Sequence, residues 1–165
     1  MSGPQWLDIA RRYIGLREIK GGRHHPQILQ WWQDIGASWY RDDETPWCGA
    51  YVGGVLKEAD FPMIPKGEGA RAKAWLTYGK KVDRPAVGCI VVFDRAGGGH
   101  VGFVVGRDQH GNLMVLGGNQ SDGVNIKPFA RNRILGYRWP SVWPAEHRFT
   151  LPIVTSDGRV STNEA

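Results

Sequence analysis

The sequence predicts an α+β domain in which N-terminal helices pack on a C-terminal antiparallel β-sheet. In the first half of the chain, apolar residues recur at helical spacing. From residue 82 onward the pattern changes to short β-branched runs separated by glycine-containing turns. Helices followed by hairpin-linked strands are typical of the α+β class. A length of 165 residues suits one compact domain rather than two.

Four helices are expected in the first half. They cover residues 4–15, 26–35, 48–59 and 69–78. The third helix begins at a cysteine, Cys48, and contains Gly53 and Gly54 in its interior. Each of these glycines weakens a helix by about 1 kcal/mol relative to alanine. Their presence therefore predicts close packing of this helix against another element.

Five strands are expected in the second half. They cover residues 89–93, 100–105, 113–116, 124–127 and 134–139. From about residue 145 the chain is polar and weakly patterned. We therefore expect one domain over residues 1–144 and a tail over residues 145–165, which is either loose or adds an edge strand through residues 149–154.

Composition narrows the class of partner. The net charge is +5 and the isoelectric point is about 9.4, so the surface favours polyanions such as nucleic acid or an anionic cell envelope. No block of five like charges occurs, which argues against nucleic acid. Neither a signal peptide nor an apolar run of 18 residues is visible, and two cysteines make no disulfide framework. We expect synthesis in the cytoplasm and no membrane insertion.

Cys48 is the candidate nucleophile. An acidic, proline-containing turn leads into it, and it falls in the first turn of the third helix. There the unpaired backbone N–H groups and the positive end of the helix dipole are expected to lower the pKa of the thiol. The other cysteine, Cys89, lies in an apolar strand and is expected to be a small buried hydrophobic residue.

His100 and Asn119 are the candidate base and orienting residue. His100 follows three glycines at the start of a strand, and Asn119 lies at the end of the next strand. In an antiparallel pair the start of one strand faces the end of the other, which brings these two residues together. Gln120 and Asp122 are alternative orienting residues. Asn119 is also open to a second interpretation, as a turn residue in a left-handed conformation.

Three motifs together resemble the CHAP/NlpC-type peptidoglycan hydrolases, and more narrowly the small single-domain CHAP-like proteins of phages and bacteria. The motifs are Thr45-Pro46-Trp47-Cys48, Gly99-His100-Val101-Gly102 and Gly117-Gly118-Asn119-Gln120, and the resemblance covers about residues 4–143. It implies a papain-like fold and hydrolysis of a peptidoglycan amide bond through a thioester. By this resemblance Cys48 is the nucleophile, His100 the general base and acid, and Asn119 the orienting residue.

Other residues are expected to complete the site. The backbone N–H of Cys48, with Tyr40 as a second donor, is expected to form an oxyanion hole. Tyr40, Trp47, Gln120 and Trp139 are expected to line a substrate groove. The contiguous acids of residues 42–44 lack the alternating spacing of a calcium loop, so we expect a solvated loop, no metal and no cofactor.

The predicted function is a peptidoglycan amidase or endopeptidase, of the type used by phages as an endolysin. Such a protein is synthesised in the cytoplasm and reaches the cell wall after holin-type release. The alternatives are an injected antibacterial effector, a tail-associated lysin, a non-catalytic wall-binding module, and a cysteine protease or deamidase acting on protein. Bacterial peptidoglycan is the expected partner, together with anionic envelope components, and a monomer is expected.

Overall fold

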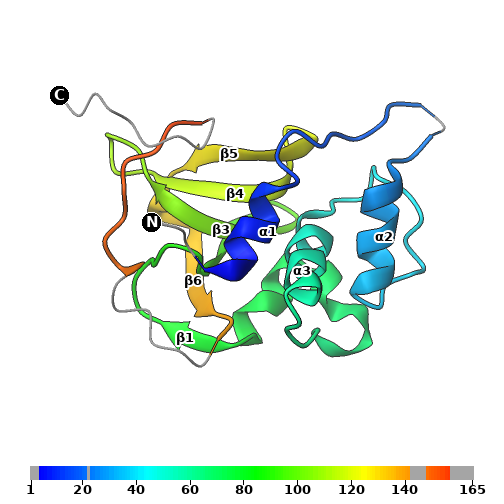
Figure 1. Cartoon of the computed structure of the whole chain (residues 1–165), viewed down its shortest axis with the longest axis horizontal. Helices are drawn as coiled ribbons and strands as arrows, with labels where there is room; N and C mark the ends of the chain where they lie inside the picture. Colours follow the sequence, from blue (N-terminus) through cyan, green and yellow to red (C-terminus); the bar gives the residue numbers. More distant parts are fainter. Residues whose placement is uncertain (1–3, 22, 142–147, 157–165) are drawn as a thin grey trace.

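Helices from the first part of the chain lie beside an antiparallel sheet from the second part (Figure 1). This computed structural model describes residues 4–21, 23–141 and 148–156. Within them, the α-helices are α1 (Gln5–Arg11), α2 (Pro26–Asp34) and α3 (Cys48–Glu58). The predicted α+β class and the order of helices before sheet are confirmed.

The sheet has six strands in the order β1-β6-β2-β3-β4-β5, and all neighbours are antiparallel. The strands are β1 (Lys80–Val82), β2 (Ile90–Arg95), β3 (Gly98–Arg107), β4 (Leu113–Gln120), β5 (Gly123–Phe129) and β6 (Ile134–Trp139). Strands β2 to β5 follow one another as hairpins, and β6 returns to pair with β2. The sequence analysis did not predict β1, whose three residues carry little apolar patterning.

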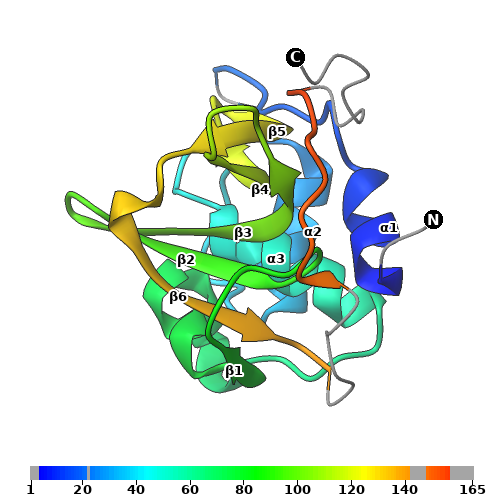
Figure 2. The same cartoon turned by 90° about the vertical axis from the view of Figure 1, so that its left-hand side faces the viewer.

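Helix α3 packs against β3 and β4, and it lies behind these strands in Figure 2. Its first nine residues are all buried. Tyr51 faces the ring of Phe103 edge-on, and its hydroxyl donates to the carbonyl of Ala10 at 2.8 Å. A methyl group at Gly53 would overlap Ile35, and one at Gly54 would overlap the Trp31 indole. The close packing predicted from these two glycines is therefore present.

The helix predicted over residues 69–78 is replaced by two short 3₁₀ segments, η1 (Pro65–Ala70) and η2 (Ala72–Thr77). Lys66 and Gly67 have positive φ angles inside η1 and interrupt helical geometry. The indole of Trp75 is fully buried and donates to the carbonyl of Gly69 at 2.9 Å, which ties the two segments together. Burial of this side chain therefore outweighs the helical preference of a segment rich in alanine, arginine, lysine and leucine.

Two segments outside the strands attach to the sheet. Residues 15–18 pair with the start of β5 through backbone hydrogen bonds to Val124 and Asp122. Near the other end of the chain, Arg107 bonds to the backbone of Pro152 and Val154 and forms a parallel bridge with Ile153. The edge strand expected as one option for residues 149–154 is thus a single bridge, and residues 145–147 and 157–165 lie outside the described residues.

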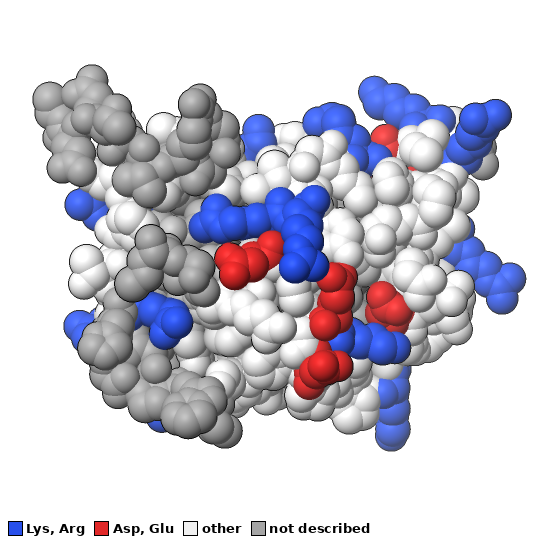
Figure 3. Space-filling view, in the orientation of Figure 1, with Lys and Arg blue, Asp and Glu red and all other residues white. Residues whose placement is uncertain are grey.

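Figure 3 shows basic and acidic side chains intermingled on the face that carries α1 and α3. Arg12 and Glu58, for example, form an exposed ion pair between these helices at 3.4 Å. The positive charge is therefore not gathered into one continuous patch on this face. In the described part of the chain, every helix is too short or too polar to cross a lipid bilayer.

Candidate active site

Cys48 is the first residue of α3, and its side chain is almost fully buried, with 3% of the residue exposed. The backbone N–H groups of Val101, Gly49 and Cys48 itself lie near its sulfur, and each of them lowers the pKa of the thiol. The contact with Val101 places the sulfur beside the start of β3, one residue along the chain from His100. Thiol and imidazole are thus held by adjoining parts of the fold.

Burial dominates the acidity of this thiol. It raises the pKa of Cys48 above the ordinary value, and the hydrogen bond from Val101 and the positive charge of Arg95 offset this only in part. The sequence analysis expected the opposite direction from the helix N-terminus. That contribution is present, because the N–H groups of Gly49 and Cys48 also lower the pKa, but it is smaller than the cost of burying a thiolate.

His100 lies on β3 opposite Phe93 of β2, and it is 4% exposed. Its ring stacks on Phe129 with the centroids 5.2 Å apart and the planes 12° apart. Burial lowers the pKa of His100 to about 4, and the positive charge of Arg95 acts in the same direction. The imidazole is therefore neutral at physiological pH, as a general base must be before it accepts a proton.

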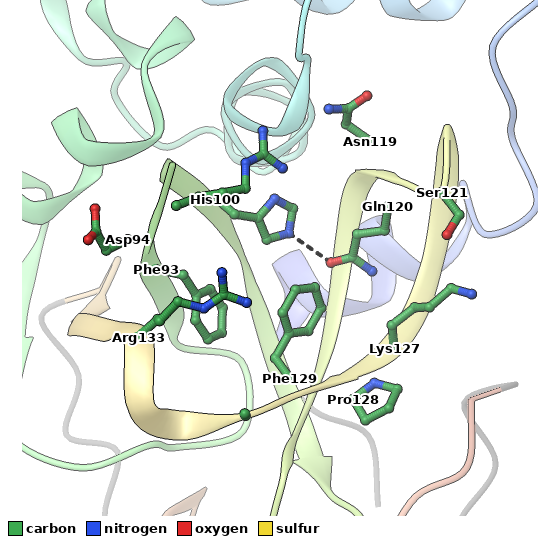
Figure 4. Close-up of a pocket in the computed structure, with 12 residues that line it drawn as sticks. Phe93, Asp94, His100, Asn119, Gln120, Ser121, Lys127, Pro128, Phe129 and Arg133 are labelled. Carbon is green, nitrogen blue, oxygen red and sulfur yellow. Dashed lines mark hydrogen bonds between the residues drawn. The ribbon is translucent and has the colours of Figure 1, made fainter. Parts of the chain in front are cut away.

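Gln120, at the end of β4, orients this imidazole (Figure 4). Its Oε1 lies 3.0 Å from Nε2 of His100. Its Nε2, which carries two hydrogens, lies within hydrogen-bond distance of three oxygens: the carbonyls of Val115 at 3.2 Å and Asn125 at 2.9 Å and the side-chain oxygen of Asn125 at 3.0 Å. The amide is thus fixed with its NH₂ group toward acceptors and its oxygen toward the histidine.

This amide orientation determines the histidine tautomer. Because Oε1 of Gln120 is only an acceptor, Nε2 of His100 must carry the proton and donate. In a neutral imidazole the other nitrogen, Nδ1, then has a free lone pair. Nδ1 is buried and has no hydrogen-bond partner among the described residues. The structure therefore presents Nδ1 as a proton acceptor.

Asn119 does not contact this ring. It adopts a left-handed conformation with φ of 59°, and in Figure 4 its carboxamide lies apart from the hydrogen bond between His100 and Gln120. The pairing of β4 with β5 shifts by one residue between Gly117 and Gln120. This bulge turns Gln120 to the face of the sheet that regular alternation would give to Asn119. Asn119 still lines the cavity beside His100.

Gly117 makes room for the contact between His100 and Gln120. A Cβ atom at Gly117 would overlap Oε1 of Gln120 and lie 3.4 Å from Nε2 of His100. The neighbouring Gly118 faces the opposite side of the sheet, where a Cβ would be 2.7 Å from both the Trp47 ring and Cβ of Tyr51. These two glycines let the histidine network and helix α3 approach β4 from its two faces.

Two cavities flank the candidate catalytic residues. One, of about 270 Å³, lies beside His100, and the other, of about 400 Å³, lies beside Cys48. Arg95 lines both cavities, which places it where they meet. It is also the charged side chain that acts on the pKa values of both Cys48 and His100. A substrate lying along both cavities would pass the thiol and the imidazole.

The aromatic residues expected in the groove divide into two groups. Tyr40 is half-buried against Trp32 and lines the cavity that contains Cys48. Trp47 is fully buried and donates its indole N–H to Glu18 at 2.7 Å. Trp139 is 2% exposed and packs on Trp6. Neither tryptophan lines the two cavities, because hydrophobic burial places both in the core.

The acidic run before Cys48 is structural rather than a solvated loop. Asp42 accepts the backbone N–H groups of Glu44 and Thr45 at 2.9 and 2.6 Å. Asp43 is fully buried and accepts the N–H groups of Ile19 and His25 at 2.8 and 2.9 Å. The expectation of a solvated loop was therefore wrong for Asp43, since backbone donors replace the water around its carboxylate.

Sequence reasoning missed the position of Arg95 and ranked Gln120 behind Asn119. The arginine ends β2 beside a tight glycine turn, and no motif marks it. The bulge contains the left-handed residue Asn119, and the left-handed residues 121 and 122 form the hairpin turn that follows, so the whole stretch is rich in turn-forming residues. That composition was the available signal for an extra residue in β4.

Comparison with known proteins points to one family. No curated protein matches the chain. Residues 39–119 match the family model of the CHAP domain, and this segment runs from beside Tyr40 through Cys48 and His100 to Asn119. The matched segment thus includes the thiol, the imidazole and most of the strands that hold them. Over residues 39–119 the chain is similar to the CHAP domain, and this match supports a CHAP-type peptidoglycan hydrolase.

Proposed function

We propose that this protein hydrolyses an amide bond of peptidoglycan through a thioester on Cys48, with His100 as the general base and acid. The observation that carries the proposal is the free lone pair on Nδ1 of His100, buried beside the segment of β3 that bonds to the Cys48 sulfur. Gln120 is proposed as the residue that orients the imidazole. Asn119, expected in that role from the sequence, is proposed to border the substrate instead.

The proposed reaction begins from a neutral pair, because burial disfavours both the thiolate and the imidazolium. The Cys48 proton moves to Nδ1 of His100 as the sulfur attacks the amide carbonyl carbon. His100 then returns the proton to the departing nitrogen, the C–N bond breaks, and an amine and a thioester remain. Water attacks the thioester with His100 again as base, which releases a carboxylic acid and restores the thiol.

The oxyanion of the tetrahedral intermediate needs donors near Cys48. We propose the backbone N–H of Cys48, at the start of α3, and the hydroxyl of Tyr40, which borders the same cavity. The hydroxyl of Tyr40 has no hydrogen-bond partner within the described part of the chain, so it is available to a substrate. The positive charge of Arg95 adds electrostatic stabilisation of the developing negative charge.

Digestion of purified peptidoglycan tests this proposal. Wild type should release fragments with new termini, and Cys48→Ala should release none. Cys89→Ala is the matched control, because Cys89 is the other free cysteine and is fully buried away from both cavities. Fragment masses identify whether the cut lies at the sugar–peptide amide or within the peptide. Equal digestion by wild type and Cys48→Ala would contradict the proposed chemistry.

We propose a lysin of the phage endolysin type as the biological setting. The basic charge of +5 supports attachment to an anionic envelope. Expression in bacteria with and without a co-expressed holin tests this setting. Lysis that requires the holin supports it, whereas lysis of neighbouring cells only on contact would favour an injected effector. Binding of the wall without turnover, by both wild type and Cys48→Ala, would favour a wall-binding module.

A further inference from the structure

The cavity beside His100 is lined in part by positively charged side chains. Its lining includes three cationic side chains, Arg95, Lys127 and Arg133, and one carboxylate, that of Asp94. Asp94 is already paired, because its Oδ1 lies 2.8 Å from Nζ of Lys73. None of the three cationic side chains has an ion-pair partner within the described residues. The cavity therefore offers unpaired positive charge to a ligand.

The floor of this cavity is aromatic. The Phe129 ring stacks on His100, at 5.2 Å, and on Phe93, at 5.0 Å, and these two rings lie 6.2 Å from each other. Figure 4 shows Lys127 and Arg133 on opposite sides of the Phe129 ring. The positive side chains thus border an aromatic surface that extends directly from the catalytic imidazole. A peptide placed there would rest its aliphatic atoms on the rings and direct its charged groups to the rim.

We propose that this cavity is a carboxylate-binding subsite that selects an acidic peptide on one side of the cleaved amide, with Arg95, Lys127 and Arg133 as its recognition residues. This inference rests on the proposed hydrolysis and names the substrate class of the same site. A peptide carries free carboxylates at its C-terminus and at its acidic residues. Arginine binds such groups through two parallel N–H···O bonds, which adds geometric selectivity to charge attraction.

Arg95 has a distinct part in this recognition. It lines both cavities, so it reaches the segment of substrate that crosses the thiol and the imidazole. Lys127 and Arg133 come from β5 and from η3 (Arg131–Arg133), and they line only the cavity beside His100. Substitution of Lys127 and Arg133 therefore tests peptide selection without removing the charge nearest the reacting atoms.

The test uses two synthetic wall peptides that are identical except that each free carboxylate of the first is a carboxamide in the second. Binding is measured by calorimetry to a Cys48→Ala chain, which leaves the peptide intact. Each charge-assisted hydrogen bond that the carboxamide cannot form corresponds to about tenfold in affinity. We expect the acidic peptide to bind about tenfold or more tightly than its amide. Adding Lys127→Gln and Arg133→Gln should bring both peptides to the weaker affinity.

The matched control is Lys80→Gln with Lys81→Gln on β1, at the opposite edge of the sheet from β5. It removes the same two charges from exposed positions outside both cavities and should preserve the preference. Equal binding of the two peptides, or the same loss of preference in the control, would overturn the subsite.

Cleavage by the wild-type chain separates the two proposals. Equal cleavage of both peptides would support the proposed hydrolase activity and contradict the proposed carboxylate-binding subsite. The opposite result is that the acidic peptide binds more tightly but neither peptide nor intact wall is cleaved in a Cys48-dependent way. That result would support the subsite and contradict the hydrolase activity.

Discussion

At the scale of single residues, the proposed catalysis depends on which amide binds His100. Gln120 fixes the Nε2 proton and leaves Nδ1 as the proposed base, whereas Asn119 has a left-handed backbone. The distinction arises from one extra residue in β4. Asn119 and Gln120 both carry a carboxamide, so the sequence does not show which of them faces His100. Only the register of β4 decides this.

The first prediction concerns this pair. Gln120→Ala should lower kcat by about tenfold or more, because the imidazole loses the acceptor that selects its tautomer. Asn119→Gly keeps the left-handed backbone and should change kcat much less. Steady-state cleavage of a soluble wall peptide measures both. A larger loss for Asn119→Gly than for Gln120→Ala would assign the orienting role to Asn119.

His100 also makes stability depend on pH. Its pKa is about 4 in the folded chain, against an ordinary value of 6.5, so between these values the unfolded chain binds a proton that the folded chain does not. The free energy of unfolding should therefore fall as the pH falls. Relative to His100→Gln, wild type should lose about 2 kcal/mol more between about pH 7 and pH 4.5. Urea unfolding at the two pH values measures this difference. Equal losses of unfolding free energy in wild type and His100→Gln would contradict the prediction.

At the scale of elements, helix α3 is the part that the sequence predicted best. Its start at Cys48, its end near residue 59 and the tight packing at its glycines were all expected from the pattern of apolar residues. The strands β2 to β6 were also predicted, with ends that differ by a few residues. The 3₁₀ segments were predicted as one helix, because the bond from the Trp75 indole to Gly69 is a tertiary interaction that local spacing does not reveal.

Gly54 tests the packing of this element. Alanine would favour the helix by about 1 kcal/mol, but its methyl group would overlap the Trp31 indole, and overpacking costs about 1–3 kcal/mol. We expect Gly54→Ala to lower the free energy of unfolding in chemical denaturation. Lys57→Ala, at an exposed position of the same helix, should leave it nearly unchanged. An increase in stability for Gly54→Ala would mean that α3 does not pack closely against Trp31 of α2.

At the scale of the whole molecule, the candidate active site is assembled from segments that long-range interactions hold together. Trp6 donates to the carbonyl of Gly88 at 2.7 Å, joining α1 to the sheet, and Trp47 reaches Glu18. Trp47 and Trp139 were expected to line a groove, and the sequence alone could not separate a position in a groove from one in the core. Their burial follows from how helices and sheet pack together.

Asp43 is one of these long-range connections. Burial raises the pKa of its carboxyl, but hydrogen bonds from Ile19, His25 and His24 outweigh this and lower the pKa overall. Asp43→Ala would leave the backbone N–H groups of Ile19 and His25 without their acceptor and should destabilise the fold by about 2 kcal/mol. Glu44→Ala, at the exposed neighbouring position, is the matched control and should change stability little. Thermal unfolding of both variants at neutral pH measures the effect, and equal shifts would contradict this role.

The thioester is the most direct test of the account. Wild type is mixed with a soluble wall peptide, quenched in acid within milliseconds, and its intact mass is measured. We predict a fraction of the protein with the added mass of the acyl fragment, mapped to the peptide that contains Cys48 and absent from Cys48→Ala. Rapid cleavage of the peptide with no acyl fragment on Cys48, and with activity retained by Cys48→Ala, would contradict the account.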